Sequence, residues 1–162
     1  MSEFKRDVRS LLVWILKHFS NNNLLYEVPS PFPRYTQAQA DEVVKAMVEK
    51  GILREGSRAL PINYTSPGDP PLDTGSEDPV ADKGHFLIAE PLFPSDNVNL
   101  NVGDWIIADS PKGLRAHHIV YMWPIEGIKT RGTNCIADDE EITYPSDLRY
   151  LVCGVLYGGL GK

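Results

Sequence analysis

The chain has 162 residues, of which 42% are hydrophobic and 23% are charged, and its formal net charge is −6. This composition is typical of a soluble globular protein with a buried core. No apolar run approaches the roughly 20 residues of a membrane-spanning helix, so we expect no membrane span. Two cysteines, Cys135 and Cys153, are too few for a disulfide framework, which favours a reducing, cytoplasmic setting.

Charge is distributed unevenly along the chain. Residues 1–58 contain nine Lys and Arg against seven Asp and Glu, whereas residues 59–162 contain seven against fifteen. This asymmetry indicates two units, and the acidic second unit by itself is a poor partner for nucleic acid.

The first unit is predicted to be helical. Apolar residues recur at helical spacing over residues 7–19, and Pro29, Pro31 and Pro33 then exclude a long helix. Thr36 is a predicted N-cap for a second helix that Gly51 ends. The core face of this helix is expected to consist of Ala40, Val43, Val44 and Met47. Residues 52–60 follow as a predicted hairpin with Gly56 at its tip.

Helices followed by a small hairpin resemble a winged helix, a DNA-binding variant of helix-turn-helix. The resemblance implies a wing that carries Arg54 and Arg58. DNA contacts on the second helix would come from Thr36, Gln37, Gln39 and Lys45. Because this helix also carries Asp41, Glu42 and Glu49, which would repel phosphates, a protein-contact role stays open.

The rest of the chain divides into a linker and a β region. Proline, glycine, serine, threonine and aspartate dominate residues 66–82, which predicts a linker at 61–83 between units at 1–60 and 84–162. Residues 85–89 begin the β region as a short strand. Three further pieces, 95–104, 116–121 and 128–139, each join polar residues to β-type apolar runs. Their polar groups are therefore expected at strand ends and turns, where reactive side chains are often held.

These pieces resemble the fold shared by signal peptidase I and the self-cleaving repressor proteases. Ser95 stands eight residues before Gly103, which Asp104 and an apolar run follow. His117 and His118 precede two β-branched residues, residues 130–134 precede the paired Asp138 and Asp139, and residues 150–154 form a closing apolar strand that ends in glycine.

The resemblance implies a serine peptidase acting on a protein or peptide. Ser95 would be the nucleophile, and either His117 or Lys129 would be its base. Asp139 or Asp138 would orient the histidine. The backbone N–H of Ser95 and a neighbouring donor would stabilise the oxyanion, and the substrate would lie extended along an open strand edge.

Several residues depart from the family pattern, namely Asp96, Val98, His118 and Thr133. These departures favour a second hypothesis, a non-catalytic assembly or virion-type component that retains the fold. A third hypothesis is a transcriptional regulator whose β domain only dimerises. Under the structural alternatives Ser95 is an ordinary turn residue, residues 138–141 are a solvated charge run, and Lys129 and Arg131 are plain surface residues.

The predicted fold class is α+β, with a helical winged-helix-like unit before a mostly antiparallel β domain of the signal peptidase and repressor protease type. Trp105, Tyr121 and Trp123 are predicted to be core residues. No cofactor is expected, and no second cluster of histidine or cysteine supports a metal site. We expect an oligomer, located in the cytoplasm or within a larger assembly such as a virion.

Overall fold

The computed structural model describes residues 34–62, 80–81, 84–93, 96, 99–111, 113–123 and 126–157. The expected helix over residues 7–19 and most of the predicted linker lie outside these residues. The described chain forms helix α2 (Gln37–Glu49), a short 3-10 helix η2 (Pro145–Asp147) and six strands. The strands are β1 (Arg58–Pro61), β2 (Phe86–Pro91), β3 (Trp105–Ser110), β4 (Gly113–Trp123), β5 (Gly127–Arg131) and β6 (Leu148–Leu156).

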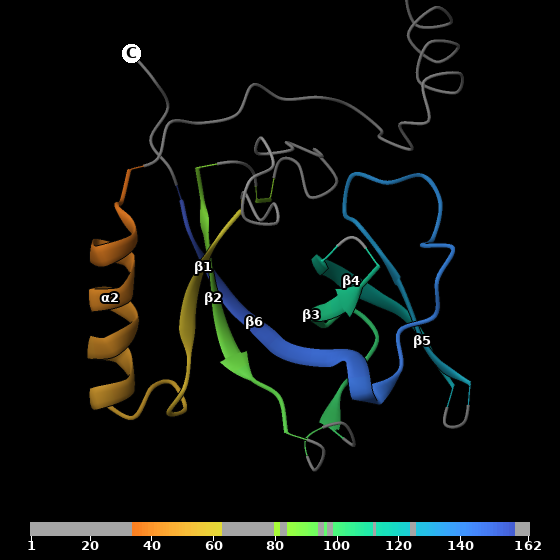
Figure 1. Cartoon of the computed structure of the whole chain (residues 1–162), viewed down its shortest axis with the longest axis horizontal. Coiled ribbons are helices and arrows are strands. Elements are labelled where there is room, and N and C mark those ends of the chain that lie inside the picture. The colour runs from red at the N-terminus through yellow and green to blue at the C-terminus, as the bar shows by residue number, and fades with distance from the viewer. Residues whose placement is uncertain are drawn as a thin grey trace, which may run out of the picture.

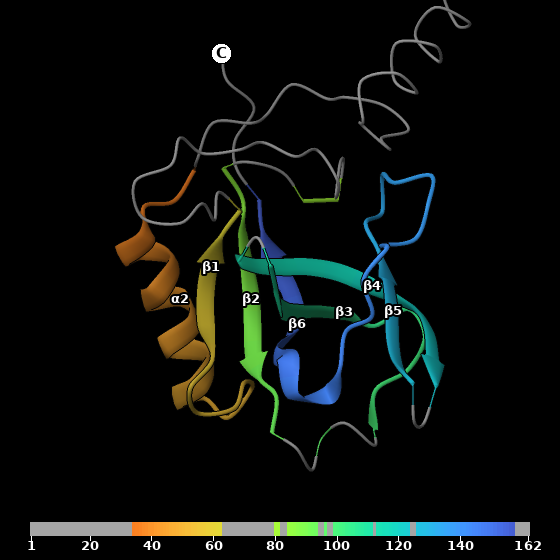
Figure 2. The same ribbon diagram turned by 45° about the vertical axis from the view of Figure 1, so that its right-hand side comes forward.

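All six strands belong to one antiparallel sheet in the order β1-β2-β6-β3-β4-β5, with α2 beside β1 (Figure 1). The α+β class and the antiparallel sheet are therefore confirmed. Figure 2 shows β3 and β4 running across the direction of β1 and β2, so the sheet is strongly twisted. No helix in the described ranges has the length and apolarity to cross a membrane.

Helix α2 begins at the predicted cap. The Thr36 hydroxyl accepts a hydrogen bond from the Gln39 backbone N–H, and the Gln39 side chain accepts one from the Thr36 backbone N–H. Such a cap stabilises a helix by roughly 0.5–2 kcal/mol. The predicted face is the one that packs, since Ala40 and Val44 are buried in it.

The prediction of a hairpin over residues 52–60 is wrong. Leu53 is buried against α2, and the Ser57 N–H and hydroxyl both donate to the Arg54 carbonyl at 3.2 and 2.7 Å, so the chain turns without forming a strand. The only strand in this stretch is β1, which pairs with β2 through the register Ala59 to Ile88. Residues 54–56 are Arg, Glu and Gly and are exposed, so they offer no apolar surface to β1, whereas Ala59 of β1 is buried in a cluster with Phe86 and Ile88 of β2.

One core cluster therefore contains residues from both sides of the predicted linker. It comprises Ala40, Val44, Leu53, Ala59, Phe86 and Ile88. The boundaries 1–60, 61–83 and 84–162 stay a prediction, and within the described residues α2 and β1 pack with β2.

Both faces of β3 are buried. Ile106 and Ala108 contribute to one cluster, with Leu100, Ile119, Ile128 and Leu148, whereas Trp105 and Ile107 contribute to another, with Ala81, Leu87 and Ala89. Since successive strand residues alternate between faces, the neighbouring β4 residues His117 and His118 lie on opposite faces.

The aromatic residues at the end of β4 differ from the prediction. Trp105 is buried as expected, but Tyr121 and Trp123 are 59% and 38% exposed and stack on each other with ring centroids 5.6 Å apart. Strand β3 pairs with β4 only as far as His118, and a bulge follows between Ile119 and Tyr121. The last part of β4 therefore pairs with β5 and lacks the cover that β3 provides earlier.

Candidate active site around His117 and Asp139

His117 and Asp139 are in direct contact although 22 residues separate them. The His117 Nδ1 atom lies 2.7 Å from Asp139 Oδ2, and the two side chains are 10% and 13% exposed. His117 belongs to β4, opposite Ile106 of β3. Asp139 lies beyond β5, where its backbone N–H donates to the Thr130 carbonyl at 2.8 Å. The sheet thus brings a predicted base and its predicted orienting carboxylate together.

The Asp139 carboxylate has two further partners. The Thr130 hydroxyl donates to Oδ2, and the Arg115 Nε lies 3.7 Å from the same oxygen. Arg115 also pairs with Glu141. Burial raises the pKa of Asp139, but the His117 hydrogen bond and charge, the Thr130 hydrogen bond and the Arg115 charge together lower it below its usual value. The carboxylate is therefore ionised at neutral pH.

An ionised carboxylate can only accept hydrogen bonds, so the hydrogen between the two side chains belongs to His117 Nδ1. In a neutral imidazole this leaves Nε2 as the atom that accepts a proton. Asp139 thereby selects the tautomer that a general base requires.

Of the two neighbouring aspartates, Asp139 is the one that contacts the histidine. Asp138 Oδ1 lies 3.5 Å from Arg131 Nη1, whereas the Asp139 carboxylate pairs with His117. Only the end of the charge run behaves as a solvated loop, because Glu140 and Glu141 are exposed while Asp138 and Asp139 are half-buried.

Lys129, the other candidate base, has a different environment. Its Nζ donates to the Glu140 carbonyl at 3.0 Å. Lys129 lies between Ile128, which belongs to a core cluster, and Thr130, which contacts Asp139, so alternation along β5 directs Lys129 to the opposite face. His117 and Lys129 therefore do not point to one common place, and the geometry favours His117.

The outer edge of β5 is already paired. Ile128 and Thr143 exchange two backbone hydrogen bonds of 2.7 and 2.8 Å. The Asp139 N–H donates to the carbonyl of Thr130, which belongs to the same strand. Residues 139–143, here called the edge segment, therefore occupy the place along β5 where an extended peptide would add. A substrate that pairs with the sheet would need another edge.

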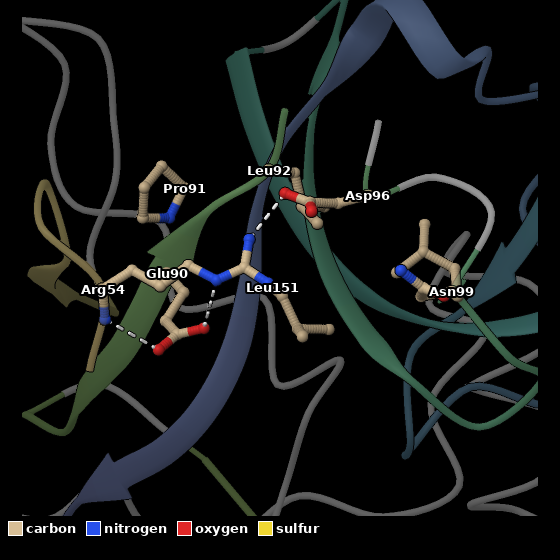
Figure 3. A pocket seen from close by; sticks show the side chains of 8 residues that line it. Arg54, Glu90, Pro91, Leu92, Asp96, Asn99 and Leu151 are labelled. Atoms are coloured by element: carbon tan, nitrogen blue, oxygen red, sulfur yellow. Dashed lines mark hydrogen bonds and ion pairs between the residues drawn. The ribbon is translucent and has the colours of Figure 1, made fainter. Parts of the chain in front are cut away.

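Ser95 lies outside the described residues, but its neighbour Asp96 is described. The Asp96 carboxylate accepts a hydrogen bond from the Phe93 N–H at 3.0 Å and one from Arg54 Nη1 at 2.6 Å. Figure 3 shows Arg54 reaching between Glu90 and Asp96 at a small pocket. The pocket is lined by Arg54, Glu90, Pro91, Leu92, Asp96, Asn99, Leu100 and Leu151.

His118 has a packing role. Its ring stacks on Trp105 with centroids 5.0 Å apart, and its Nδ1 lies 3.3 Å from the Gly103 carbonyl. It lies on the face of β4 opposite His117, so it does not join the contact with Asp139.

Most of the predicted DNA-contact residues form hydrogen bonds or ion pairs with other residues of this chain. The Gln37 amide donates to Asp41 and to the Ala59 carbonyl, at 2.8 and 2.9 Å. Thr36 and Gln39 form the helix cap, and Lys45 Nζ lies 3.9 Å from Glu49 Oε1. Arg54 pairs with Glu90 and Asp96, and Arg58 is exposed at the start of β1. DNA contact by these residues stays a prediction.

Sequence reasoning missed Arg115 and the role of the Thr130 hydroxyl. The signal for Arg115 was present, because residues 115 and 117 are two apart on a strand and must share a face. Thr130 could be recognised only from the pairing that sets β5 beside the edge segment. In the part of the chain that the structure describes, no group of three or more His, Cys, Asp and Glu side chains could hold a metal ion. No protein-family model, curated protein or solved structure matches this chain.

Proposed function

We propose that this chain is a serine peptidase in which Ser95 is the nucleophile and His117 the general base. The fold proposed with it is a β domain of the signal peptidase and repressor protease type, preceded by a winged-helix-like unit around α2. The observation that carries the proposal is the contact of 2.7 Å between His117 Nδ1 and Asp139 Oδ2, made by two side chains that are little exposed.

The proposed reaction follows from this contact. The Ser95 hydroxyl attacks the peptide carbonyl carbon while its proton passes to His117 Nε2, and Asp139 stabilises the imidazolium that forms. The tetrahedral intermediate collapses as His117 gives the proton to the leaving amine. Water then releases the acyl group from Ser95 by the same sequence of proton transfers.

Burial supports a functional origin for the pair. Placing an ionised carboxylate and a titratable imidazole in a half-buried position costs solvation energy, and apolar replacements are often as stable. Titratable groups brought together under partial burial are a common feature of catalytic sites. Asp139 adds to this pattern because its partners hold its pKa below the usual value despite burial.

The test is covalent labelling with an alkyl fluorophosphonate, whose phosphorus is attacked by an activated serine oxygen with loss of fluoride. Mass spectrometry of the labelled protein is expected to find the adduct on Ser95. His117→Gln should slow labelling by about 10²- to 10⁴-fold, the usual contribution of a general base. Ser146→Ala, at an exposed serine in η2, is the matched control and should label at the wild-type rate. Labelling that is absent, or that His117→Gln does not slow, would refute the proposal.

A second candidate function, a non-catalytic assembly component, is favoured by a different observation. Tyr121 and Trp123 form an exposed stacked pair, and large aromatic side chains at a surface are enriched in protein interfaces. In that case Tyr121→Ser with Trp123→Ser would shift the molar mass measured by light scattering from an oligomer to a monomer, and no serine would react with the fluorophosphonate.

A further inference from the structure

Arg54 joins three segments of the chain. It lies between α2 and β1, and its backbone N–H donates to Glu90 Oε1 at 3.0 Å. Its guanidinium Nε lies 3.7 Å from Glu90 Oε2, and its Nη1 donates to Asp96 Oδ2 at 2.6 Å. Glu90 of β2 therefore holds Arg54 at both its backbone and its side chain, as Figure 3 shows.

The Asp96 end of this contact is also fixed. The Asp96 N–H donates to the Phe93 carbonyl at 2.8 Å, and the Phe93 N–H donates back to Asp96 Oδ2. Asp96 and Phe93 are thus joined twice, and Arg54 adds a charge-assisted bond from outside the turn. The Phe93 hydrogen bond and Arg54 lower the pKa of Asp96, so the carboxylate that receives both is ionised at neutral pH.

Asp96 is the residue that follows the proposed nucleophile. We propose that Arg54, in the α2–β1 connection, is a positioning residue for the proposed reaction and acts through Asp96, the described residue to which Ser95 is covalently joined. This inference rests on the proposed function. It gives Arg54, which precedes the predicted linker, a role in a reaction whose proposed catalytic residues all follow that linker.

Arginine fits this role better than lysine would. A guanidinium presents separate N–H groups to two carboxylates at once, whereas a lysine ammonium acts as a point charge. Arg54→Lys is therefore expected to retain part of the effect and Arg54→Ala none of it. Arg149→Ala is the matched control, because the Arg149 guanidinium forms an exposed pair with Asp109 and donates to the Ser146 carbonyl.

The experiment measures fluorophosphonate labelling of Ser95 in the whole 162-residue chain as a function of pH. Arg54→Ala should lower the second-order labelling rate by about 10- to 100-fold, since small misplacement of a reacting group has effects of that size. The pH midpoint of labelling should stay at the wild-type value, because His117 and Asp139 are untouched. Exchanging the pair, as Arg54→Asp with Asp96→Arg, should restore part of the rate.

Hydrogen exchange followed by mass spectrometry gives a second readout. Peptides covering residues 92–100 should exchange faster in Arg54→Ala than in wild type and Arg149→Ala. Equal labelling of wild type and Arg54→Ala at Ser95 overturns this inference while the proposed function stands. A shifted pH midpoint in Arg54→Ala also overturns it, because positioning would then not be the cause. Absence of Ser95 labelling in wild type refutes the proposed function and this inference with it.

Discussion

Thr130 and Asp139 are joined twice, by a backbone hydrogen bond from Asp139 to Thr130 and by a side-chain hydrogen bond from Thr130 to Asp139. The carboxylate oxygen that accepts the Thr130 hydroxyl, Asp139 Oδ2, also contacts His117 Nδ1. Asp139 therefore bonds both to β5 and to the imidazole of His117. A movement of the edge segment away from β5 at this residue would also move the hydrogen-bond partner of the candidate base.

This connection predicts the effect of removing the Thr130 hydroxyl. Thr130→Val retains shape but takes one donor from a half-buried carboxylate, and we expect a loss of roughly 1–3 kcal/mol in the free energy of unfolding. Urea denaturation measures it. Thr130→Ser keeps the hydroxyl and is the control. A Thr130→Val protein as stable as wild type would show that the hydrogen bond is not needed to hold Asp139.

Stability should depend on pH through Asp139. Its folded pKa lies below the unfolded value of about 3.9, so its ionised form is stabilised by folding. The resulting stability is fully present above the unfolded pKa and is lost as pH falls through the folded one. The stability difference between wild type and Asp139→Asn should therefore narrow below about pH 4. A constant difference from pH 7 to pH 2 would contradict this reasoning.

Gly127 should not tolerate a side chain. It has a φ of 109°, and an added Cβ would lie 2.5 Å from Ile142 Cγ2 and 3.0 Å from the Thr143 carbonyl. Gly127→Ala therefore combines backbone strain with a clash against the edge segment. Gly113 is a matched control because it has the same φ but nothing within 4 Å of an added Cβ.

Thermal or urea unfolding should find Gly127→Ala less stable than Gly113→Ala. The strain term, about 1–3 kcal/mol, is shared by both variants, so the difference between them measures the clash. Equal stabilities would mean that the edge segment can move away from β5 at little cost.

Cys153 is expected to be a slow nucleophile. Cys153 is exposed, but partial burial of its thiol and the negative charge of Glu90 raise the pKa of the thiol, which reduces the thiolate fraction at neutral pH. Iodoacetamide should modify Cys153 more slowly at pH 7.5 than it modifies glutathione, and Glu90→Gln should speed the reaction. Mass spectrometry of the Cys153 peptide over time measures both rates. Modification of the wild-type thiol as fast as glutathione would count against this pKa shift.

Features with local causes were predictable from the sequence. The start of α2 follows from Thr36 and Gln39, which are three residues apart and satisfy each other's hydrogen bonds. The hairpin of β4 and β5 follows from an apolar run at residues 119–123 and a short β-type run at residues 127–131, on the two sides of a short connection. The two candidate bases and the two aspartates could also be picked out from the sequence, because the ability of a side chain to accept or donate a proton depends first on its residue type.

Tertiary structure alone decided which of these residues meet. Strand β1 pairs with β2 across the predicted linker, and this pairing buries Ala59 in a cluster with Phe86 and Ile88. One residue of register separates Asp139, which reaches His117, from Asp138, which reaches Arg131. A bulge and the end of β3 leave Tyr121 and Trp123 exposed. Side-chain direction alternates with each strand residue, so long-range pairing sets what every polar group contacts.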